Sequence, residues 1–385
     1  MSQKHIQFGK PLIGENEKLN VTDVLSGSQF VHGEYAKSFE NNFSKRIGVK
    51  NSITTSSCTA ALHLALHANK ININNEVIVP AMSHVATAHC VEYQGAKPVF
   101  VDIDKKTGNI DLDQLEIALS NNNIKAINLV HFLGIPCDVN KIKKICEGKD
   151  IIIIEDCALA LDASLDNIKV GTLGDVGCFS FYPTKHITTG EGGMLTTNNQ
   201  IIAKKVRKMK AFGYDNSLGE RKIPGIYDVL DLGYNYRMSE FHAAIGLAQL
   251  KKLDKFLKIR EENYDYLHKE LKNIQEIYIP NENNKRFKSS RYCLNIILSE
   301  KICSIRNTMI QNLKNRNIGV SVHYPKAIPH FKYYKDKYSF SENDFPVAKW
   351  YAEGTISLPV GPHLNLDDMV SIKDAVKDLI YKLKK

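Results

Sequence analysis

Short apolar runs alternate with longer stretches of helical periodicity from about residue 50 to residue 200. Several runs, such as IIIIED at 151–156, are almost wholly apolar, which is typical of strands buried on both faces of a sheet. The alternation predicts an α/β fold with a mostly parallel sheet between layers of helices. The predicted strands are 51–56, 76–80, 97–104, 125–130, 151–156, 178–181 and 193–197, and the predicted helices are 59–69, 84–94, 111–120 and 138–147.

The pattern changes near residue 240. A long charged helical stretch leads into a part with fewer apolar strands and more Lys, Asn and Tyr. We therefore expect a large domain over residues 1–250 and a smaller C-terminal domain over 251–385. The elements predicted there are a helix over 240–272, strands at 294–299 and 318–324, a last helix over 367–383 and an exposed loop over 281–291.

Composition narrows the class of protein. With 385 residues, 43% hydrophobic and 24% charged, the chain resembles an ordinary globular protein, and no apolar run is long enough for a membrane span. Eight scattered cysteines without a C-x-x-C pair favour reduced thiols over disulfides or a metal site, so we expect a cytoplasmic protein. The net charge of +9 is spread out, and no nucleic-acid-binding motif accompanies it, so we expect no nucleic-acid partner.

Lys185 has the most informative surroundings. It lies in SFYPTKHITTGEGG at 180–193, between a predicted strand and a glycine-rich turn. Asp156 ends a four-isoleucine strand, where a carboxylate is unfavourable unless it is paired. A strand-end acid, a lysine and Ser180 form a set that can hold pyridoxal 5'-phosphate (PLP). The amine forms a Schiff base, the acid pairs with the ring nitrogen and the serine holds phosphate.

Two strand-to-helix turns add to this set. At 54–66 (TTSSCTAALHLAL), the backbone N–H groups of a helix start can bind phosphate. At 80–89 (PAMSHVATAH), His84 can stack on a flat ring. Each residue also has an ordinary explanation: a helix cap for the Ser/Thr turn and for Asp156, a helix-start polar residue for His84, and a solvated surface charge for Lys185.

These motifs together resemble the DegT/StrS family of PLP-dependent sugar aminotransferases nearly from end to end. The most specific are the run around Lys185 and GYNYRMSE at 233–240. The resemblance implies a PLP-dependent transferase of fold type I and a homodimer with shared active sites. Other matching blocks are SSCTAALHLAL, MSHVATA, PVFVDID, IIEDCALA, VHYPK and ISLPVGPHL.

The resemblance also implies roles for single residues. Lys185 would be the Schiff-base lysine, Asp156 the partner of the pyridine nitrogen, and Asn235 would reach the phosphate in the partner subunit's site. The phosphate ligands would be Ser180 and the backbone at Cys58 and Thr59.

Three positions depart from the family pattern. Cys58 replaces a glycine in the phosphate turn, and His84 stands where the family usually has Trp, Phe or Tyr. Leu159 stands where Gln or His usually lies close to the cofactor's phenolic oxygen. These changes concern cofactor tuning and substrate more than the class of reaction.

The expected function is transfer of an amino group from an amino acid, L-glutamate by resemblance, to a nucleotide-linked keto-deoxysugar in surface polysaccharide biosynthesis. The cofactor would alternate between PLP and pyridoxamine phosphate (PMP). Alternatives are a smaller phosphorylated ketone as acceptor, a PLP-dependent sugar dehydratase, which would carry His in place of Lys185, and a non-catalytic regulatory protein. Basic residues that could meet a substrate phosphate are Lys10, Arg221, Lys222 and Arg291.

Overall fold

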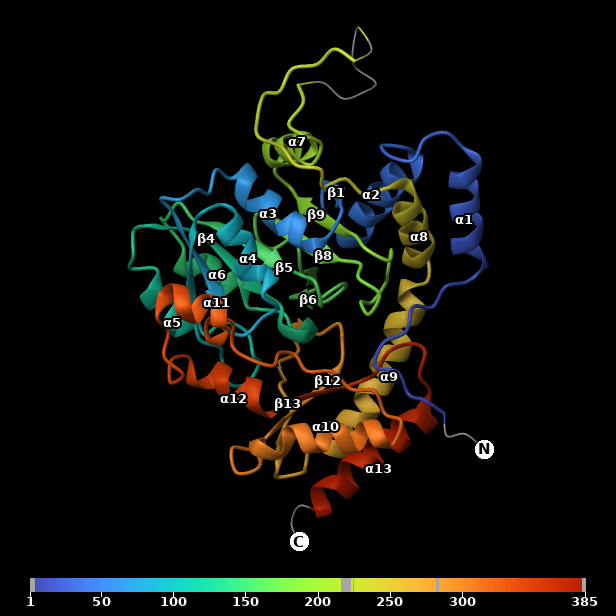
Figure 1. Cartoon of the computed structure of the whole chain (residues 1–385), viewed down its shortest axis with the longest axis vertical. Helices are drawn as coiled ribbons and strands as arrows, with labels where there is room; N and C mark the ends of the chain where they lie inside the picture. The colour runs from blue at the N-terminus through green and yellow to red at the C-terminus, as the bar shows by residue number, and fades with distance from the viewer. Residues whose placement is uncertain (1–3, 216–222, 224, 282–283, 383–385) are drawn as a thin grey trace.

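A seven-stranded sheet forms the centre of the molecule (Figure 1). The computed structural model describes residues 4–215, 223, 225–281 and 284–382. All neighbouring strands are parallel except the second strand of the order, which runs antiparallel to both of its neighbours. The order is β1 (Asn51–Thr55), β9 (Gly193–Thr197), β8 (Val176–Ser180), β5 (Ile152–Asp156), β4 (Ile124–Val130), β2 (Glu76–Pro80) and β3 (Lys97–Val101).

Each strand of this sheet was predicted from an apolar run, and each is confirmed within a few residues. The four helices predicted between them are also present. Two hydrophobic clusters bury the sheet, and their members come from strands and from the apolar faces of helices. The helices of this part are α1 (Glu15–Ser26), α2 (Glu34–Ile47), α3 (Cys58–Ala68), α4 (Ala86–Tyr93), α5 (Leu112–Ala118), α6 (Val139–Ile145), α7 (Gln200–Met209) and α8 (Glu240–Leu250).

The C-terminal part contains a three-stranded sheet with its own hydrophobic cluster. Figure 1 shows α9 leading from the upper part of the molecule to this region, with α10 and α13 at its base. The sheet order is β10 (Ile277–Tyr278), β12 (Leu294–Leu298) and β13 (Thr355–Leu358). The helices are α9 (Leu253–Leu271), α10 (Arg306–Asn315), α11 (Lys332–Tyr338), α12 (Pro346–Gly354) and α13 (Leu366–Lys382).

Three predictions for this half need correction. The strand predicted at 318–324 is wrong, because Ile318 bridges to Ile6 whereas Ser321 bridges to Ser357, so no continuous ladder forms. The helix predicted over 240–272 is two helices, α8 and α9, with a turn between them. The loop predicted at 281–291 includes β11 (Phe287–Lys288), which extends a small sheet with β6 (Ser164–Leu165) and β7 (Ile168–Lys169).

The turn between α8 and α9 lies next to the domain boundary predicted at residue 250, and that boundary stays a prediction. The described residues before α1, which we call the N-terminal arm, cross this boundary, because Ile6 packs in the C-terminal hydrophobic cluster. Among the described residues, no helix has both the length and the apolar character that a membrane span requires.

Candidate active site

Lys185 lies in the connection between β8 and β9. Backbone hydrogen bonds from Phe181 to Gly192 and from Thr189 to Phe181 close this connection into a compact loop. The lysine is half-buried, and its Nζ lies 5.5 Å from the ring centroid of Tyr292. Burial lowers the pKa of the Lys185 amine below its ordinary value of 10.5. The interpretation of Lys185 as a solvated surface charge is therefore wrong.

Asp156 ends β5 and is 5% exposed. Its Oδ2 accepts a hydrogen bond of 2.8 Å from the Thr87 hydroxyl, and Oδ1 accepts one of 3.0 Å from the Ala158 backbone N–H. The Thr87 hydroxyl lies a further 2.8 Å from that of Ser83. The carboxylate thus supports the turn that follows its strand, and a hydroxyl chain from the start of α4 fixes its orientation.

The start of α3 is capped by Ser57, whose side chain accepts from the Ala60 N–H. By helix geometry, the amides of Cys58 and Thr59 have no acceptor within the helix. Gly193 packs against this turn so closely that a Cβ there would lie 2.6 Å from the Cys58 nitrogen. Since Gly193 is paired with Ser180 across β8 and β9, the structure brings Ser180 and the α3 turn to one place.

Asp156 is paired with Cys178 across the neighbouring strands β5 and β8, so Asp156, the α3 turn and the loop that carries Lys185 meet at one edge of the sheet. Cys58 and Asp156 also lie close enough to Lys185 to influence the pKa of its amine. Burial raises the pKa of the Cys58 thiol well above its ordinary value, which keeps this thiol neutral. His84 lies within electrostatic range of this group but is exposed in the single chain, and partial burial and then the charge of Lys185 lower the pKa of its imidazole. Its ring lies edge-on to Tyr324, with centroids 6.0 Å apart, and its Nδ1 accepts from the Ala86 N–H at the start of α4.

Two other predicted residues have different surroundings. Leu159 is buried in an apolar cluster, and its carbonyl accepts from the Ser290 hydroxyl at 2.9 Å. Asn235 is exposed and accepts from Arg237, so its own chain does not enclose it.

The four basic residues expected to meet a substrate phosphate also differ in their surroundings. Lys10 lines a pocket beside Lys185. Arg291 instead packs over the Tyr264 ring at 4.2 Å and pairs with Asp265 at 3.6 Å. Arg221 and Lys222 lie outside the described residues.

The pocket beside Lys185 contains residues that sequence reasoning missed. Tyr292 is buried below the lysine, and its hydroxyl lies 3.3 Å from that of Thr184. Arg260 of α9 donates to the Tyr292 carbonyl. Burial lowers the pKa of Arg260 to about 10, so it remains a buried cation at neutral pH. The N-terminal arm closes the pocket on one side and His363 lies near its edge.

PLP requires a phosphate site, an acid for its ring nitrogen and an amine for its aldehyde. The α3 turn offers free amides against a glycine that leaves no room for a side chain, and Asp156 and Lys185 supply the acid and the amine. The residues present therefore fit this cofactor. The fold and the site together define a PLP-dependent transferase.

Comparison with known proteins extends this conclusion. The chain belongs to the DegT/DnrJ/EryC1/StrS aminotransferase family, which its residues 11–377 match. It is 36% identical to the spore coat polysaccharide biosynthesis protein SpsC of Bacillus subtilis over 97% of both chains. It is 32% identical to GDP-perosamine synthase of Vibrio cholerae, over 96% of this chain and 97% of that protein.

Among solved structures, it resembles the sugar aminotransferase Spr1654 of Streptococcus pneumoniae with a TM-score of 0.91. That protein was solved in PLP and PMP forms, and in both the identity is 28% over 98% of this chain and 99% of the other. The chain is therefore a PLP-dependent aminotransferase, as the sequence predicted.

Proposed function

We propose that this aminotransferase transfers an amino group to the keto group of a nucleotide-linked keto-deoxysugar, with L-glutamate as the donor. The names of two relatives support this acceptor: one is a GDP-perosamine synthase and the other a polysaccharide biosynthesis protein. The observation that carries the proposal is the convergence of Lys185, Asp156 and the α3 turn on one site. We place the product in a surface polysaccharide and the reaction in the cytoplasm.

PLP, when bound, supplies an aldehyde that takes up the amino group and a ring that stabilises negative charge. Lys185 would hold the aldehyde and, once released from it, would carry a proton at its Nζ between the α-carbon of the amino donor and the aldehyde carbon of the cofactor. Its lowered pKa shifts the amine toward the neutral form that this role needs. Asp156, oriented by Thr87 and Ala158, keeps the ring nitrogen protonated.

The remaining predicted residues hold the cofactor in this proposal. The amides of Cys58 and Thr59 and the hydroxyl of Ser180 bind the phosphate, and His84 covers one face of the ring. The buried wall formed by Tyr292 excludes water below Lys185.

The dehydratase alternative would need a histidine in the role of Lys185. His186 is the nearest candidate in sequence, but it is buried and its Nε2 bonds to the Ser290 carbonyl at 3.0 Å. That hydrogen bond ties the imidazole to a segment about a hundred residues away in sequence, which favours transamination by Lys185.

We further propose a homodimer with shared active sites. Asn235, the residue expected to reach the partner's cofactor, is exposed, as a side chain directed to a second subunit would be in one chain. The segment before it carries many exposed apolar side chains, which are typical of a surface that another protein covers. They are Ile223, Ile226, Tyr227, Val229, Leu230 and Leu232.

The test uses the purified protein in its PMP form with a panel of ketones. Nucleotide-linked 3-keto and 4-keto sugars form one group, and small ketose phosphates form the other. Return of the PLP absorbance with one nucleotide sugar is the expected result. A response confined to small phosphorylated ketones would contradict the proposed acceptor, and would make His84 and Leu159 the first residues to exchange for the family's usual ones.

A further inference from the structure

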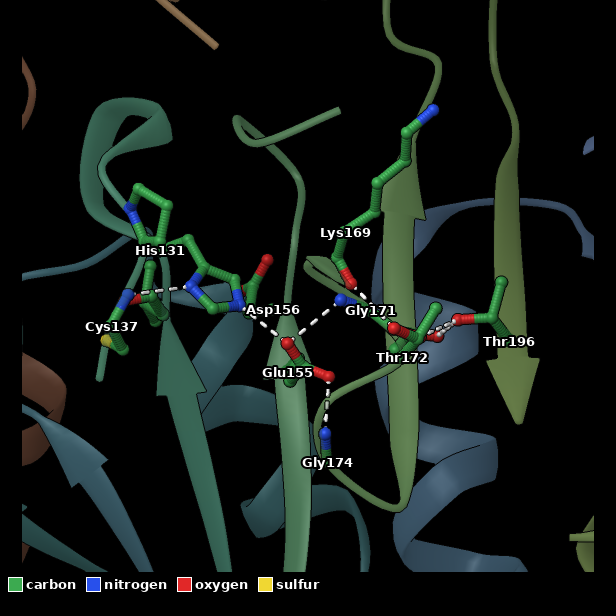
Figure 2. A network of polar contacts seen from close by, with 12 residues as sticks. His131, Cys137, Glu155, Asp156, Lys169, Gly171, Thr172, Gly174 and Thr196 are labelled. Atoms are coloured by element: carbon green, nitrogen blue, oxygen red, sulfur yellow. Dashed lines mark hydrogen bonds and ion pairs between the residues drawn. The ribbon is translucent and has the colours of Figure 1, made fainter. Parts of the chain in front are cut away.

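Glu155 precedes Asp156 on β5 and is fully buried. Its carboxyl group accepts three hydrogen bonds, which Figure 2 shows around it. His131 Nε2 lies 2.9 Å from Oε2, the Gly171 N–H donates to Oε2 at 2.8 Å, and the Gly174 N–H donates to Oε1 at 2.6 Å. The carboxyl group thus joins the end of β4 to the loop before β8.

The hydrogen bonds of the His131 imidazole determine whether this imidazole carries a charge. Its Nδ1 accepts from the Cys137 backbone N–H at 3.0 Å, and a protonated imidazole has no lone pair for this purpose. His131 is therefore neutral and donates through Nε2. All three partners of Glu155 are donors, and a protonated carboxyl group would find no acceptor among them, so these hydrogen bonds favour the carboxylate. Among the described residues, no lysine or arginine forms an ion pair with Glu155.

A metal ion is the other explanation for such a cluster, since ligand atoms of His131, Glu155 and Cys157 lie within 4.8 Å of one another. However, both imidazole nitrogens are engaged, one by the Cys137 N–H and the other by Glu155. Burial also raises the pKa of the Cys157 thiol well above its ordinary value, which disfavours the thiolate that a metal requires. The cluster is a hydrogen-bonded network.

The network is connected directly to Asp156. The backbone N–H of His131 donates to the Asp156 carbonyl at 3.2 Å, while its side chain holds Glu155. One residue therefore fixes two consecutive positions of β5. Successive side chains of a strand point to opposite faces, so Glu155 lies behind the strand while Asp156 faces the site.

We propose that Glu155 and His131 are positioning residues for Asp156 and the cofactor's ring nitrogen. They hold the end of β5 in place, and the buried negative charge of Glu155 favours a positive charge nearby. The protonated ring nitrogen, paired with Asp156, is the positive group that the cofactor brings. A field from a buried, uncompensated charge is weakly screened, so it acts across the strand without contact.

Glu155→Gln tests this proposal because it removes the charge and keeps the shape. The matched control is Asp102→Asn. Asp102 is also buried and also accepts three N–H bonds, from Ile103, Val347 and Ala348. It follows β3 at the edge of the sheet, three strands from β5 in the sheet order.

Three quantities are measured for both variants: the melting temperature of the apoprotein, the PLP dissociation constant and the ¹⁵N chemical shift of ring-labelled PLP. We expect both variants to melt lower. Only Glu155→Gln should bind PLP more weakly, by about tenfold, which is the lower end of the loss found when a residue that orients a metal ligand is replaced. Only Glu155→Gln should move the ring ¹⁵N shift toward that of an unprotonated nitrogen.

Equal PLP affinity and an equal ¹⁵N shift in the two variants would overturn the proposal and leave Glu155 a purely structural residue. If Glu155→Gln does not fold, the same PLP titration is made on His131→Asn. We expect His131→Asn to bind PLP more weakly than Asp102→Asn, and equal binding would overturn the proposal. The experiment uses neither donor nor ketone, so its outcome is independent of the proposed acceptor.

Discussion

The two walls beside Lys185 differ in how their buried polar groups are satisfied. On the sheet side, Asp156 faces the site and Glu155 lies behind it on the same strand, and their carboxylates accept five hydrogen bonds between them from protein groups. On the opposite side, Arg260 Nε, His186 Nδ1 and His363 Nδ1 are buried without a hydrogen-bond partner among the described residues. Carboxylates that are paired in this way hold a group that stays bound, whereas buried groups without partners can exchange partners as ligands and water enter. We propose that the first wall holds the cofactor and that the second wall contacts the amino donor and the ketone, which enter and leave during the reaction.

The largest effect is expected where the two walls meet. Lys185→Ala removes both the anchoring amine and the proton carrier, and loss of proton transfer alone lowers rates by roughly 10²–10⁴-fold. Exchange of label between donor and product should fall to background, and the absorbance of the lysine-bound cofactor should disappear. Retained turnover would show that another residue takes this role.

Thr87→Val tests the paired wall. A hydrogen bond to a charged group contributes about 1.5–3 kcal/mol, so loss of the hydroxyl from Asp156 should weaken PLP binding tenfold or more. Ser83→Ala is the control, because Ser83 contacts Thr87 but has no hydrogen bond to Asp156. Titration of the apoprotein with PLP gives the affinities, and equal values for the two variants would contradict the role of Thr87.

Arg260→Met tests the opposite wall. The substitution removes a buried cation but leaves the buried Tyr292 carbonyl without its donor, and an unpaired buried acceptor costs about 1–3 kcal/mol. We therefore expect a modest loss of stability in urea, PLP affinity close to that of the wild type and a higher KM for the amino donor. A large loss of PLP affinity would mean that this wall, too, holds the cofactor.

The lowered pKa of Lys185 predicts a pH dependence of apoprotein stability. Between its lowered folded value and the ordinary value of 10.5, the unfolded chain holds a proton that the native chain lacks. The native state therefore gains stability as pH rises through this window. Lys185→Met should lack this gain, so the difference in unfolding free energy between the two proteins should shift in favour of the wild type as pH rises. Parallel pH profiles would contradict the lowered pKa.

The smallest effect is expected at His84, at the edge of both walls. His84→Trp supplies a larger ring where the family usually has an aromatic residue, and aromatic stacking contributes about 0.5–1.5 kcal/mol. PLP should bind a few-fold more tightly, with little change in the rate of the first half reaction. Weaker binding would mean that Tyr324, whose ring meets His84 edge-on, leaves no space for the larger side chain.

Local pattern predicted most of the fold and named the residues of the candidate site around Lys185. The strands β4 and β5 are predictable from their apolar runs, because a strand that is buried on both faces needs apolar side chains on both. The position of Asp156 at the end of its strand follows from the same pattern. The segment 318–324 (IGVSVHY) also has the composition of a strand, yet its bridges go to Ile6 and to β13, and such pairing partners are not encoded locally.

The sequence by itself determined the central sheet, the order of the motifs and the residues proposed to bind PLP, since each depends on a short run of chain. Only the tertiary structure decided that Tyr292 lies under Lys185, that Arg260 is a buried cation beside it and that Glu155 is an anion behind Asp156. These facts depend on contacts between distant segments, and a side chain's burial, charge and hydrogen-bond partners are properties of those contacts.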